Sequence, residues 1–329
     1  MNNVIKHLFI INPKSFWKKT KQNYVVAKIH QFFREMENSE YEIYVSRFPR
    51  DAVGFIPQFA KNLPGKTILR VYAVGGDGIL YDCLNGIVGL KNAELAAIPY
   101  GQTNNFVQGF DKNDRFSFRL LSQQYNAPAI PMDIMRCGTN YALNYCCIGV
   151  EAEAIHRAAK MREKLGKTNA LNRWICRRFY LPFFFMCGFA ACADKQLLHQ
   201  RYEIAFDEER LSGNFAGISI FNGSYYGGHL HPMSNAMPND GILDILALRI
   251  QGSIRTFISY LIYAFGGYKM FSRNLIPKRG KNITIHSDTI LEISIDGIVF
   301  FESEFEVEIL PGAIKFVDAG RHGYKGVRQ

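Results

Sequence analysis

The sequence predicts two domains: an α/β domain in residues 1–128 and a β-sandwich domain with helical inserts in residues 129–320. In the first part, apolar strand segments alternate with helical periodicity, which is typical of a mostly parallel sheet covered by helices. In the second part, strand segments follow one another directly, which is typical of antiparallel sheets. A chain of 329 residues is long enough for two such domains.

The α/β pattern can be followed along the first domain. Strands are predicted at residues 7–12, 41–47, 67–74 and 94–101, and helices at residues 25–36, at 51–63 and after residue 78. In open parallel sheets, ligands bind at the carboxyl ends of the strands. The turns at 75–78 and 99–105 both follow such ends, so they are the first candidates for a binding site.

The second domain shows a different pattern. Strands are predicted at residues 129–137, 140–149, 201–211, 215–222, 242–250, 281–287, 291–301 and 305–317, with helical inserts near 151–194 and 253–265. In the last strand, Phe305, Val307 and Ile309 alternate with polar neighbours, as in a half-exposed antiparallel strand. We expect a cleft between the two domains, which is a favoured place for a ligand.

Composition limits the partners and the compartment. The net charge of +10 indicates an anionic partner: nucleic acid, an anionic membrane surface or a phosphorylated ligand. No nucleic-acid recognition motif accompanies the charge, so we predict no nucleic-acid partner. The seven cysteines include no C-x-x-C pair, which argues against a zinc site or a disulfide framework and favours the reduced thiols of a cytosol. No signal peptide is expected at the N-terminus.

The longest apolar segment, FYLPFFFMCGFAACA at residues 179–193, is too short for a confident membrane span. It fits either a buried helix or a helix that lies at a membrane surface. Basic side chains precede it, which suits an anionic bilayer surface but also an ordinary solvated face. These side chains are Arg157, Lys160, Arg162, Lys164, Lys167, Arg173, Arg177 and Arg178.

The first candidate motif is Gly75-Gly76-Asp77-Gly78, between a buried strand and a helix. A strand that ends in glycines and leads into a helix is the usual build of a phosphate-binding turn. Asp77 is unexpected there because phosphate is also negative. The simpler interpretation is that Asp77 caps the helix.

Three further motifs follow in the chain, each with an ordinary structural explanation of its own. IPYGQTNNF at 98–106 offers backbone donors and amides, although asparagine clusters also mark turns. Asn239-Asp240-Gly241 offers oxygen ligands for a hard cation, although it also reads as a turn before a strand. Asp296-Gly297 lies between strand segments, as in a common hairpin turn.

In this order, the motifs resemble those of the diacylglycerol kinase catalytic family, which includes soluble bacterial lipid kinases and the sphingosine and ceramide kinases. The resemblance extends from Asn12-Pro13 to Pro311-Gly312-Ala313. It implies a phosphofructokinase/NAD-kinase-like α/β domain, a C-terminal β-sandwich domain, ATP and Mg²⁺ as cofactors, and a lipid hydroxyl as acceptor. GGDG alone is shared with NAD kinases and phosphofructokinases, whereas the whole ordered set is more specific.

The resemblance also implies roles for residues. Backbone amides of the glycine turn would hold the nucleotide phosphates, and Asp77 would face the cation or the acceptor hydroxyl. The nucleotide site would comprise Asn12, Gly75, Gly76, Gly78, Gly101, Thr103, Asn104 and Asn105. A structural magnesium site would comprise Asn239, Asp240 and the Ile242 backbone, with Asp133 organising the metal network.

The chain departs from the family at the residue usually assigned as general base. The family's D-G-E is Asp296-Gly297-Ile298 here, and an acid of the second turn is replaced by Asn105. Either Asp77 or Asp296 acts as the base, or the chain is a weak or inactive member that binds nucleotide or lipid. GGDG alone keeps open a third alternative, an NAD-kinase-like enzyme with a soluble acceptor.

These observations predict an activity and a cellular location for the protein. The leading hypothesis is an ATP-dependent lipid kinase of phospholipid metabolism that acts on diacylglycerol or a similar lipid alcohol. We expect a cytoplasmic protein associated peripherally with the inner face of the membrane, with an anionic membrane surface as its partner. Because the family includes dimers, a homodimer remains an open alternative.

Overall fold

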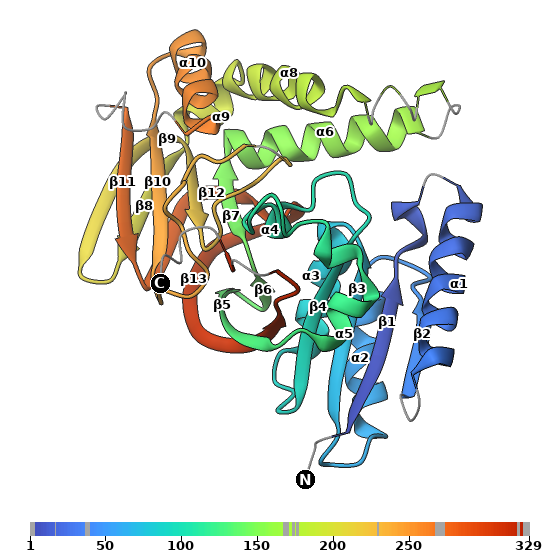
Figure 1. Ribbon diagram of the computed structural model, residues 1–329. Helices are drawn as coiled ribbons and strands as arrows, with labels where there is room; N and C mark the ends of the chain where they lie inside the picture. The colour runs from blue at the N-terminus through green and yellow to red at the C-terminus, as the bar shows by residue number, and fades with distance from the viewer. Residues whose placement is uncertain are drawn as a thin grey trace. The chain divides into compact units, whose positions relative to one another are not determined.

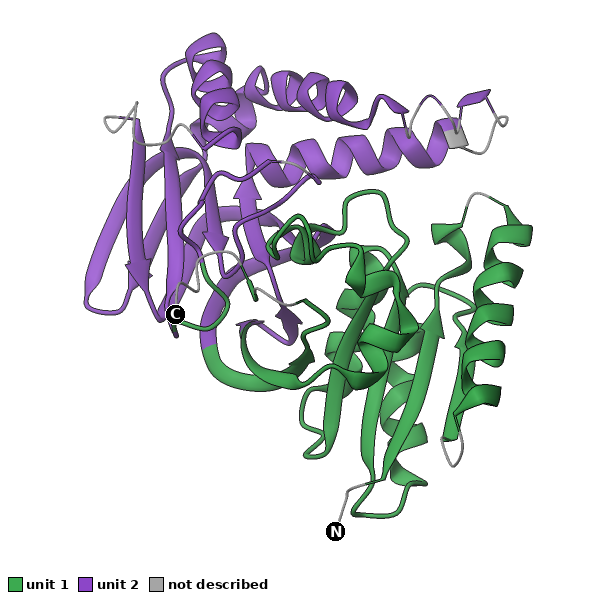
Figure 2. Ribbon diagram, in the orientation of Figure 1, with its two compact units in different colours: residues 1–134, 237–240, 310–329 green, residues 135–236, 241–309 purple. Residues whose placement is uncertain are grey.

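The chain forms two compact units (Figure 2). Unit 1 comprises Met1–Ile134, Met237–Asp240 and Leu310–Gln329, and unit 2 comprises Met135–Ala236 and Gly241–Ile309. The structure is a computed structural model that describes residues 4–16, 18–36, 40–166, 171–172, 175, 178–228, 230–266, 274–320 and 323–324.

The predicted domain boundary at 128/129 differs from this division, because two later segments return to unit 1. One of them is the end of the last strand, β13 (Ile298–Val317), which pairs in parallel with β4 (Ala93–Pro99) through Lys315 and Phe316.

Unit 1 is built on a parallel sheet (Figure 1). The strand order among the described residues is β2 (Glu40–Val45), β1 (Ile5–Ile11), β3 (Ile68–Gly75), β4 and the end of β13. The strands β3 and β4 are buried along almost their whole length, as expected for parallel strands with both faces covered. The four strands predicted for this domain are confirmed.

Helices cover this sheet at the places where the sequence predicts them. The helix α1 (Lys19–Glu35) buries Val25, Ile29 and Phe33, which recur at helical spacing. The helices α2 (Asp51–Lys61) and α3 (Asp77–Ile87) pack against each other. Shorter helical segments are η1 (Pro13–Ser15), α4 (Asn105–Gln108), η2 (Ser117–Arg119) and α5 (Leu121–Asn126).

Unit 2 is built on antiparallel strands. Their order in the described residues is β11 (Leu275–Gly280), β10 (Leu243–Arg249), β9 (Glu209–Phe221), β7 (Tyr145–Gly149), β12 (Asn282–Ile295) and the first part of β13. The strand β8 (Arg201–Phe206) also pairs with both β9 and β12, at the opposite ends of these strands from β7. The long strands β9 and β12 therefore contribute to two layers.

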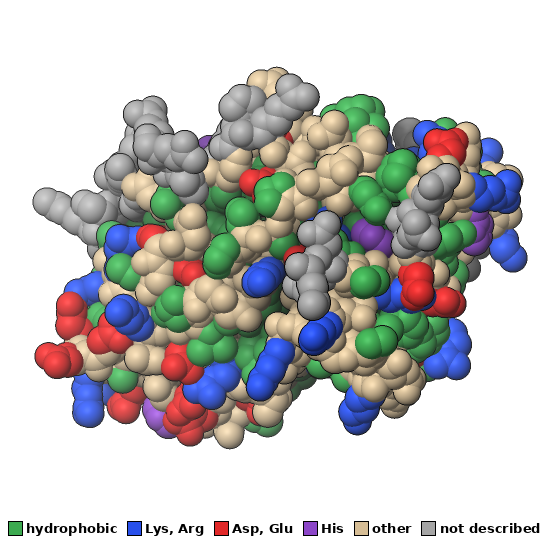
Figure 3. All heavy atoms as spheres, turned by 60° about the horizontal axis from the view of Figure 1, so that its bottom comes forward, with side chains coloured by type: hydrophobic (Ala, Val, Ile, Leu, Met, Phe, Trp, Pro, Cys, Tyr) green, Lys and Arg blue, Asp and Glu red, His purple; other side chains and the backbone are tan. Residues whose placement is uncertain are grey.

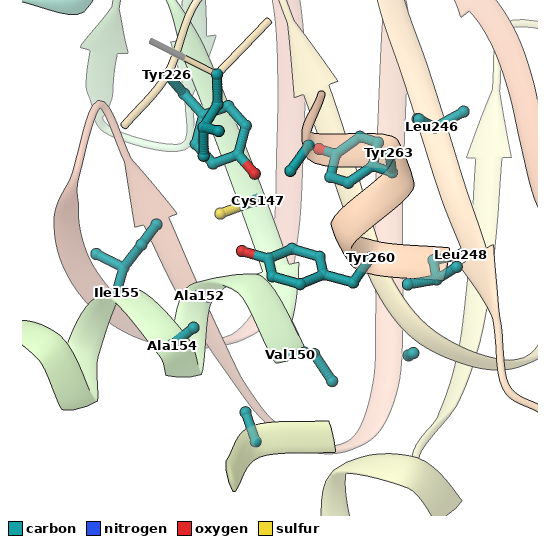
Figure 4. Packing of buried hydrophobic residues seen from close by; sticks show 14 of the residues in the cluster. Cys147, Val150, Ala152, Ala154, Ile155, Tyr226, Leu246, Leu248, Tyr260 and Tyr263 are labelled. Atoms are coloured by element: carbon teal, nitrogen blue, oxygen red, sulfur yellow. The ribbon is translucent and has the colours of Figure 1, made fainter. Parts of the chain in front are cut away.

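The helices of unit 2 gather at the upper end of its strands in the view of Figure 1. They are α6 (Val150–Gly166), α8 (Tyr180–Cys192), α9 (Lys195–His199) and α10 (Ser253–Ala264). A buried cluster joins them to the strands, and the hydroxyls of Tyr226, Tyr260 and Tyr263 point toward its middle (Figure 4). None of the described helices is both long and apolar enough to cross a membrane.

Three predicted strands are wrong in detail, and one strand was not predicted. The segment 291–301 is divided by the turn at Asp296-Gly297, between β12 and β13. The segment 201–211 is divided by a turn at Asp207, whose φ is +47°, so that β8 and β9 form a hairpin. The segment 140–149 is divided into β6 (Asn140–Ala142), which pairs with β5 (Ala129–Cys137), and β7. The strand β11 is not predicted, because its residues LIPKRG contain a proline and charges. It pairs with β10 at one end of the strand order, where a missing proline N–H is tolerated.

Candidate active site

The glycine turn of unit 1 lies against the second predicted turn. Backbone N–H groups of Tyr100 and Gly101 donate to the carbonyl oxygen of Gly75 at 2.8 and 2.9 Å. A Cβ on Gly101 would lie 2.2 Å from Cα of Gly76, and a Cβ on Gly75 would lie 2.7 Å from Oγ of Ser15. Gly101 is required because two backbone segments touch there, and Gly75 is required because side chains crowd the end of its strand.

Asp77 joins the two turns. Thr103 donates its hydroxyl to Oδ2 of Asp77 at 2.5 Å, and the backbone N–H of Asn105 donates to Oδ1 at 2.6 Å. Removal from water raises the pKa of the Asp77 carboxyl, and the bonds from Thr103 and Asn105 oppose this rise. The carboxylate thus faces polar donors of the second turn, which explains how a negative charge is accommodated beside a phosphate-binding turn.

Backbone donors remain at the start of α3. The first backbone hydrogen bond of this helix runs from the N–H of Leu80 to the carbonyl of Gly76, at 3.2 Å. The preceding N–H groups of Gly78 and Ile79 therefore point out of the helix end, where partial positive charge stabilises an anion. This geometry fits a phosphate group.

Asn12 and Asn104 shape the turns with their side chains. Asn12 ends the neighbouring strand β1, and its Oδ1 accepts from the N–H of Lys14 at 2.9 Å. Asn104 has φ +50°, and its side chain both accepts from the N–H of Gly101 and donates to the carbonyl of that residue, at 3.0 and 2.9 Å. The predicted nucleotide residues therefore meet at the carboxyl ends of β1, β3 and β4, and Asn104 acts there by holding its own loop.

Two cations near these turns were missed by sequence reasoning. The ring of Tyr100 has Nζ of Lys21 and the guanidinium of Arg119 each 5.8 Å from its centroid. Arg119 also donates from Nε to the carbonyl of Pro99 at 2.8 Å. Both cations lie outside the glycine motifs, so no local spacing could indicate them.

Three of the predicted magnesium ligands, Asp133, Asn239 and Asp240, lie in unit 1, whereas Ile242 lies in unit 2. Asp133 is buried, its Oδ1 accepts from the N–H of Gly312 at 2.8 Å, and its own N–H donates to the carbonyl of Pro238 at 2.8 Å. Asn239 and Asp240 follow directly and are exposed. This set of oxygen atoms fits a hard cation such as Mg²⁺. The carbonyl of Ile242 comes two residues later.

Asp296 occupies a hairpin turn of unit 2, as its sequence context predicts. Its φ is +46° and that of Gly297 is +86°, as in a tight turn between β12 and β13. Both carboxylate oxygens accept backbone N–H groups: Oδ2 from Leu143 at 2.8 Å, and Oδ1 from Asn144 and Tyr145 at 3.1 and 3.0 Å. A carboxylate held in this way stabilises the loop before β7, and these bonds weaken it as a base.

The position of the family's glutamate is the first residue of β13. Ile298 lies there opposite Ile295 and is partly exposed. Farther along the strand, Glu304 contacts Nε2 of His286 at 2.8 Å on an exposed surface. Glu302 lies opposite Leu291 and is also exposed.

A buried carboxylate of unit 2 was not predicted. Glu151, on α6, accepts from the Ser219 hydroxyl at 2.6 Å and from the Tyr263 hydroxyl at 3.0 Å, both at Oε2. Burial raises the pKa of Glu151 to about 7. The adjoining cavity is ≈ 10 Å³, about the room of one water molecule, and is too small for an acyl chain. The sequence around Glu151, Gly-Val-Glu-Ala, is that of an ordinary helix start, so it could not indicate a buried carboxylate.

An α/β unit with touching glycine turns, joined to an antiparallel β unit, is the architecture that the motif order predicts for a phosphotransferase. Residues 6–137 match the model of the family described as "Diacylglycerol kinase catalytic domain". Residues 185–318 match "YegS C-terminal NAD kinase beta sandwich-like domain". The chain belongs to the diacylglycerol kinase catalytic-domain family with a YegS-type C-terminal domain, so the predicted family and fold class are confirmed.

Individual relatives agree with this assignment. "Putative lipid kinase SH2167" of Staphylococcus haemolyticus (strain JCSC1435) is 22% identical over 252 residues, 75% of each chain. "Putative lipid kinase SaurJH9_0749" of Staphylococcus aureus (strain JH9) is 22% identical over 290 residues, 84% of this chain and 85% of that one. The crystal structure of a "putative diacylglycerol kinase" from Bacillus anthracis str. Sterne has a TM-score of 0.69 at 21% identity, covering 97% of this chain and 99% of that one. This last similarity establishes the shared fold.

Proposed function

We propose that this protein is a lipid kinase that transfers the γ-phosphate of ATP to the hydroxyl of diacylglycerol or a similar lipid alcohol. The observation that carries the proposal is the pair of turns joined by Asp77 in unit 1, in a family whose kinases use ATP. Phosphoryl transfer depends mainly on positioning and on neutralising charge. Backbone N–H groups of Gly78 and Ile79 would hold phosphate, and Lys21 and Arg119 would add positive charge nearby.

The chemistry of a bound Mg²⁺ would be charge neutralisation on the phosphates. Asp133, Asn239 and Asp240 would hold a structural ion in unit 1, where Asp133 already fixes the backbone of Gly312. The acceptor hydroxyl must lose a proton, and Asp77 is the candidate base because its raised pKa brings the carboxyl closer to the working pH. Asp296 is the weaker candidate because three backbone N–H groups bind its two oxygens, whereas each oxygen of Asp77 accepts one of the bonds described above.

The test is transfer of labelled γ-phosphate from ATP to lipids in mixed vesicles with Mg²⁺, with the products separated by chromatography. Labelled lipid supports the proposal and identifies the lipid class. A parallel reaction with NAD as the acceptor tests the NAD-kinase-like alternative. Absence of label in every lipid fraction contradicts the proposal, and vesicle binding without turnover then favours the binding-only alternative, which Ile298 and Asn105 motivate.

Restoring the missing acid is expected to raise the rate. Ile298→Glu places a carboxylate directly after the Asp296-Gly297 turn, on a partly exposed position that tolerates a polar side chain. We expect about a tenfold gain in transfer, at the lower end of what a general base contributes. Ile298→Gln, which has the same shape without a base, is the matched control. Equal rates in both variants would contradict a base role for this position.

We further propose that the protein binds an anionic membrane surface through helices α8 and α10. The helix α8 buries Phe184 and Cys187 on one side and exposes Met186 and Phe189 on the other, so both interpretations of the apolar segment describe part of it. The helix α10 exposes Ile254. Ring contacts join the two helices, Phe189 to Phe257 and Phe185 to Phe265, at centroid distances of 5.2 and 5.8 Å.

Exposed basic side chains lie on α6, on α10 and shortly before α8. Lys160, Lys164, Arg178 and Arg255 are exposed, whereas the predicted basic residues Lys167, Arg173 and Arg177 lie outside the described residues. Apolar side chains with adjacent cations are the combination that binds anionic interfaces. On the face drawn in Figure 3, by contrast, basic and acidic side chains both occur across the surface.

Charges on α10 are expected to weaken vesicle binding. Ile254→Glu with Ile258→Glu should lower partitioning onto phosphatidylglycerol vesicles at least tenfold, because two apolar side chains become anionic. Cosedimentation measures the effect. Ile290→Glu is the control, since Ile290 is 70% exposed and lies on β12, outside this face. Equal losses in the two proteins would contradict a specific membrane face.

A further inference from the structure

Three metal-ligating side chains converge in unit 2, and none of them is a residue that the resemblance implicates. Glu153 and His156 lie on α6, and Glu292 lies on β12. One ligand atom from each, a carboxylate oxygen or an imidazole nitrogen, lies within 4.8 Å of the other two. The spacing Glu-x-x-His places the first two on one side of the helix, facing the strand.

The contacts between these groups leave ligand atoms directed at one another. Nδ1 of His156 lies against Oε1 of Glu292 as an ion pair. Yet Oε1 is buried and has no partner in hydrogen-bond geometry. The imidazole nitrogen of His156 and the carboxylate of Glu292 therefore already face each other, as two side chains that share an ion must.

Neighbouring residues orient the ligands. Arg157 donates to Oε1 of Glu153 and also binds Asp194 at 2.9 Å. This arrangement fixes the Glu153 carboxylate and directs its other oxygen, as outer partners of metal ligands do. The ring of His156 contacts Phe301, with centroids 5.7 Å apart. The three ligand residues are only partly buried, so an ion can reach them from solvent.

We propose that Glu153, His156 and Glu292 bind a divalent transition-metal ion, Zn²⁺ above all, that links α6 to β12. One imidazole nitrogen and two carboxylates are ligands that Zn²⁺ accepts, and a water molecule would complete a tetrahedral site. The two carboxylates balance the charge of the ion.

The test uses the full chain, stripped with a chelator and titrated with Zn²⁺ by calorimetry. Excess Mg²⁺ is present so that sites formed only by oxygen ligands do not contribute. We expect one ion per chain. Co²⁺ in place of Zn²⁺ should give the visible absorption of a low-coordinate site, and bound Zn²⁺ should raise the melting temperature.

Variants decide between this site and adventitious binding. His156→Ala and Glu292→Gln should each lower the affinity on the order of 100-fold. His286→Ala is the matched control, because it removes a histidine that also contacts a glutamate, Glu304 at 2.8 Å, on an exposed part of unit 2. Circular dichroism confirms folding of each protein. Absence of binding by the wild type, or wild-type affinity in the two folded site variants, would overturn the proposal.

Discussion

Replacing Asp77 with asparagine is expected to lower phosphoryl transfer about 10³-fold while leaving the fold intact. The amide has nearly the same shape, and its single oxygen can still accept from Thr103 or from the N–H of Asn105, which now bind separate oxygens 2.5 and 2.6 Å away. What disappears is the negative charge and the capacity to accept a proton. The γ-phosphate transfer assay measures the rate, and melting temperature confirms that the fold persists.

The control for Asp77 is another aspartate of unit 1. Oδ1 of Asp318 accepts from the N–H of Gly320 at 2.9 Å, a bond that an asparagine oxygen can also accept. Asp318→Asn is expected to keep wild-type transfer within about twofold. If Asp77→Asn retains full activity, Asp77 is only a connection between the two turns. Thr103→Val separates the role of Asp77 as a base from its role as a connection between the turns. The variant removes one hydrogen-bond donor to the Asp77 carboxylate and keeps the negative charge.

The stability of unit 2 is expected to fall as pH rises from 4.5 to 7, because of Glu151. In the folded protein the pKa of this carboxyl is raised to about 7 by burial, from an ordinary value of 4.5. In this window the unfolded chain has released the proton while the folded protein still holds it. The unfolded state is therefore increasingly favoured, and the contribution levels off only once the pH has passed the folded pKa.

Glu151→Gln tests this expectation by removing the titration. The amide keeps an oxygen for the hydroxyls of Ser219 and Tyr263. Relative to wild type, the variant should gain about 2–3 kcal/mol of unfolding free energy between pH 5 and pH 8. Urea unfolding at both pH values measures this difference.

A second variant checks the cause of the shift. The Ser219 hydroxyl favours the charged form of Glu151, so Ser219→Ala should raise the pKa of Glu151 and move the window to higher pH. Parallel stability curves for wild type and Glu151→Gln would mean that Glu151 does not hold its proton in the folded protein.

Sequence alone predicted what depends on neighbours along the chain. The period-two and helical patterns predicted β1 to β4 and α1 to α3, because the periodicity of apolar residues is a property of each segment by itself. Glycine at 75, 76 and 101 marked the strand ends, and the order of the motifs indicated the family. The turn at Asp296-Gly297 was also predicted, because only positive φ closes such a hairpin.

Tertiary structure decided what depends on segments far apart in the sequence. Asp77 meets Thr103 and Asn105 across 26 and 28 residues, so local spacing could not show that its carboxylate faces the second turn. Asp296 accepts the backbone of Leu143 across 153 residues, which makes it a structural carboxylate as well as a candidate base.

Contacts between distant segments also determine the pairing of the last strand and the cluster of proposed metal ligands in unit 2. Alternation predicts that residues 305–317 form a strand, but only packing determines that the strand leaves the antiparallel unit and pairs with β4. Glu153 and His156 share a helical spacing that sequence displays, whereas Glu292 lies 136 positions beyond His156 and joins them only because β12 packs against α6. Local patterns specify the elements, and the burial of their apolar faces selects which polar side chains meet.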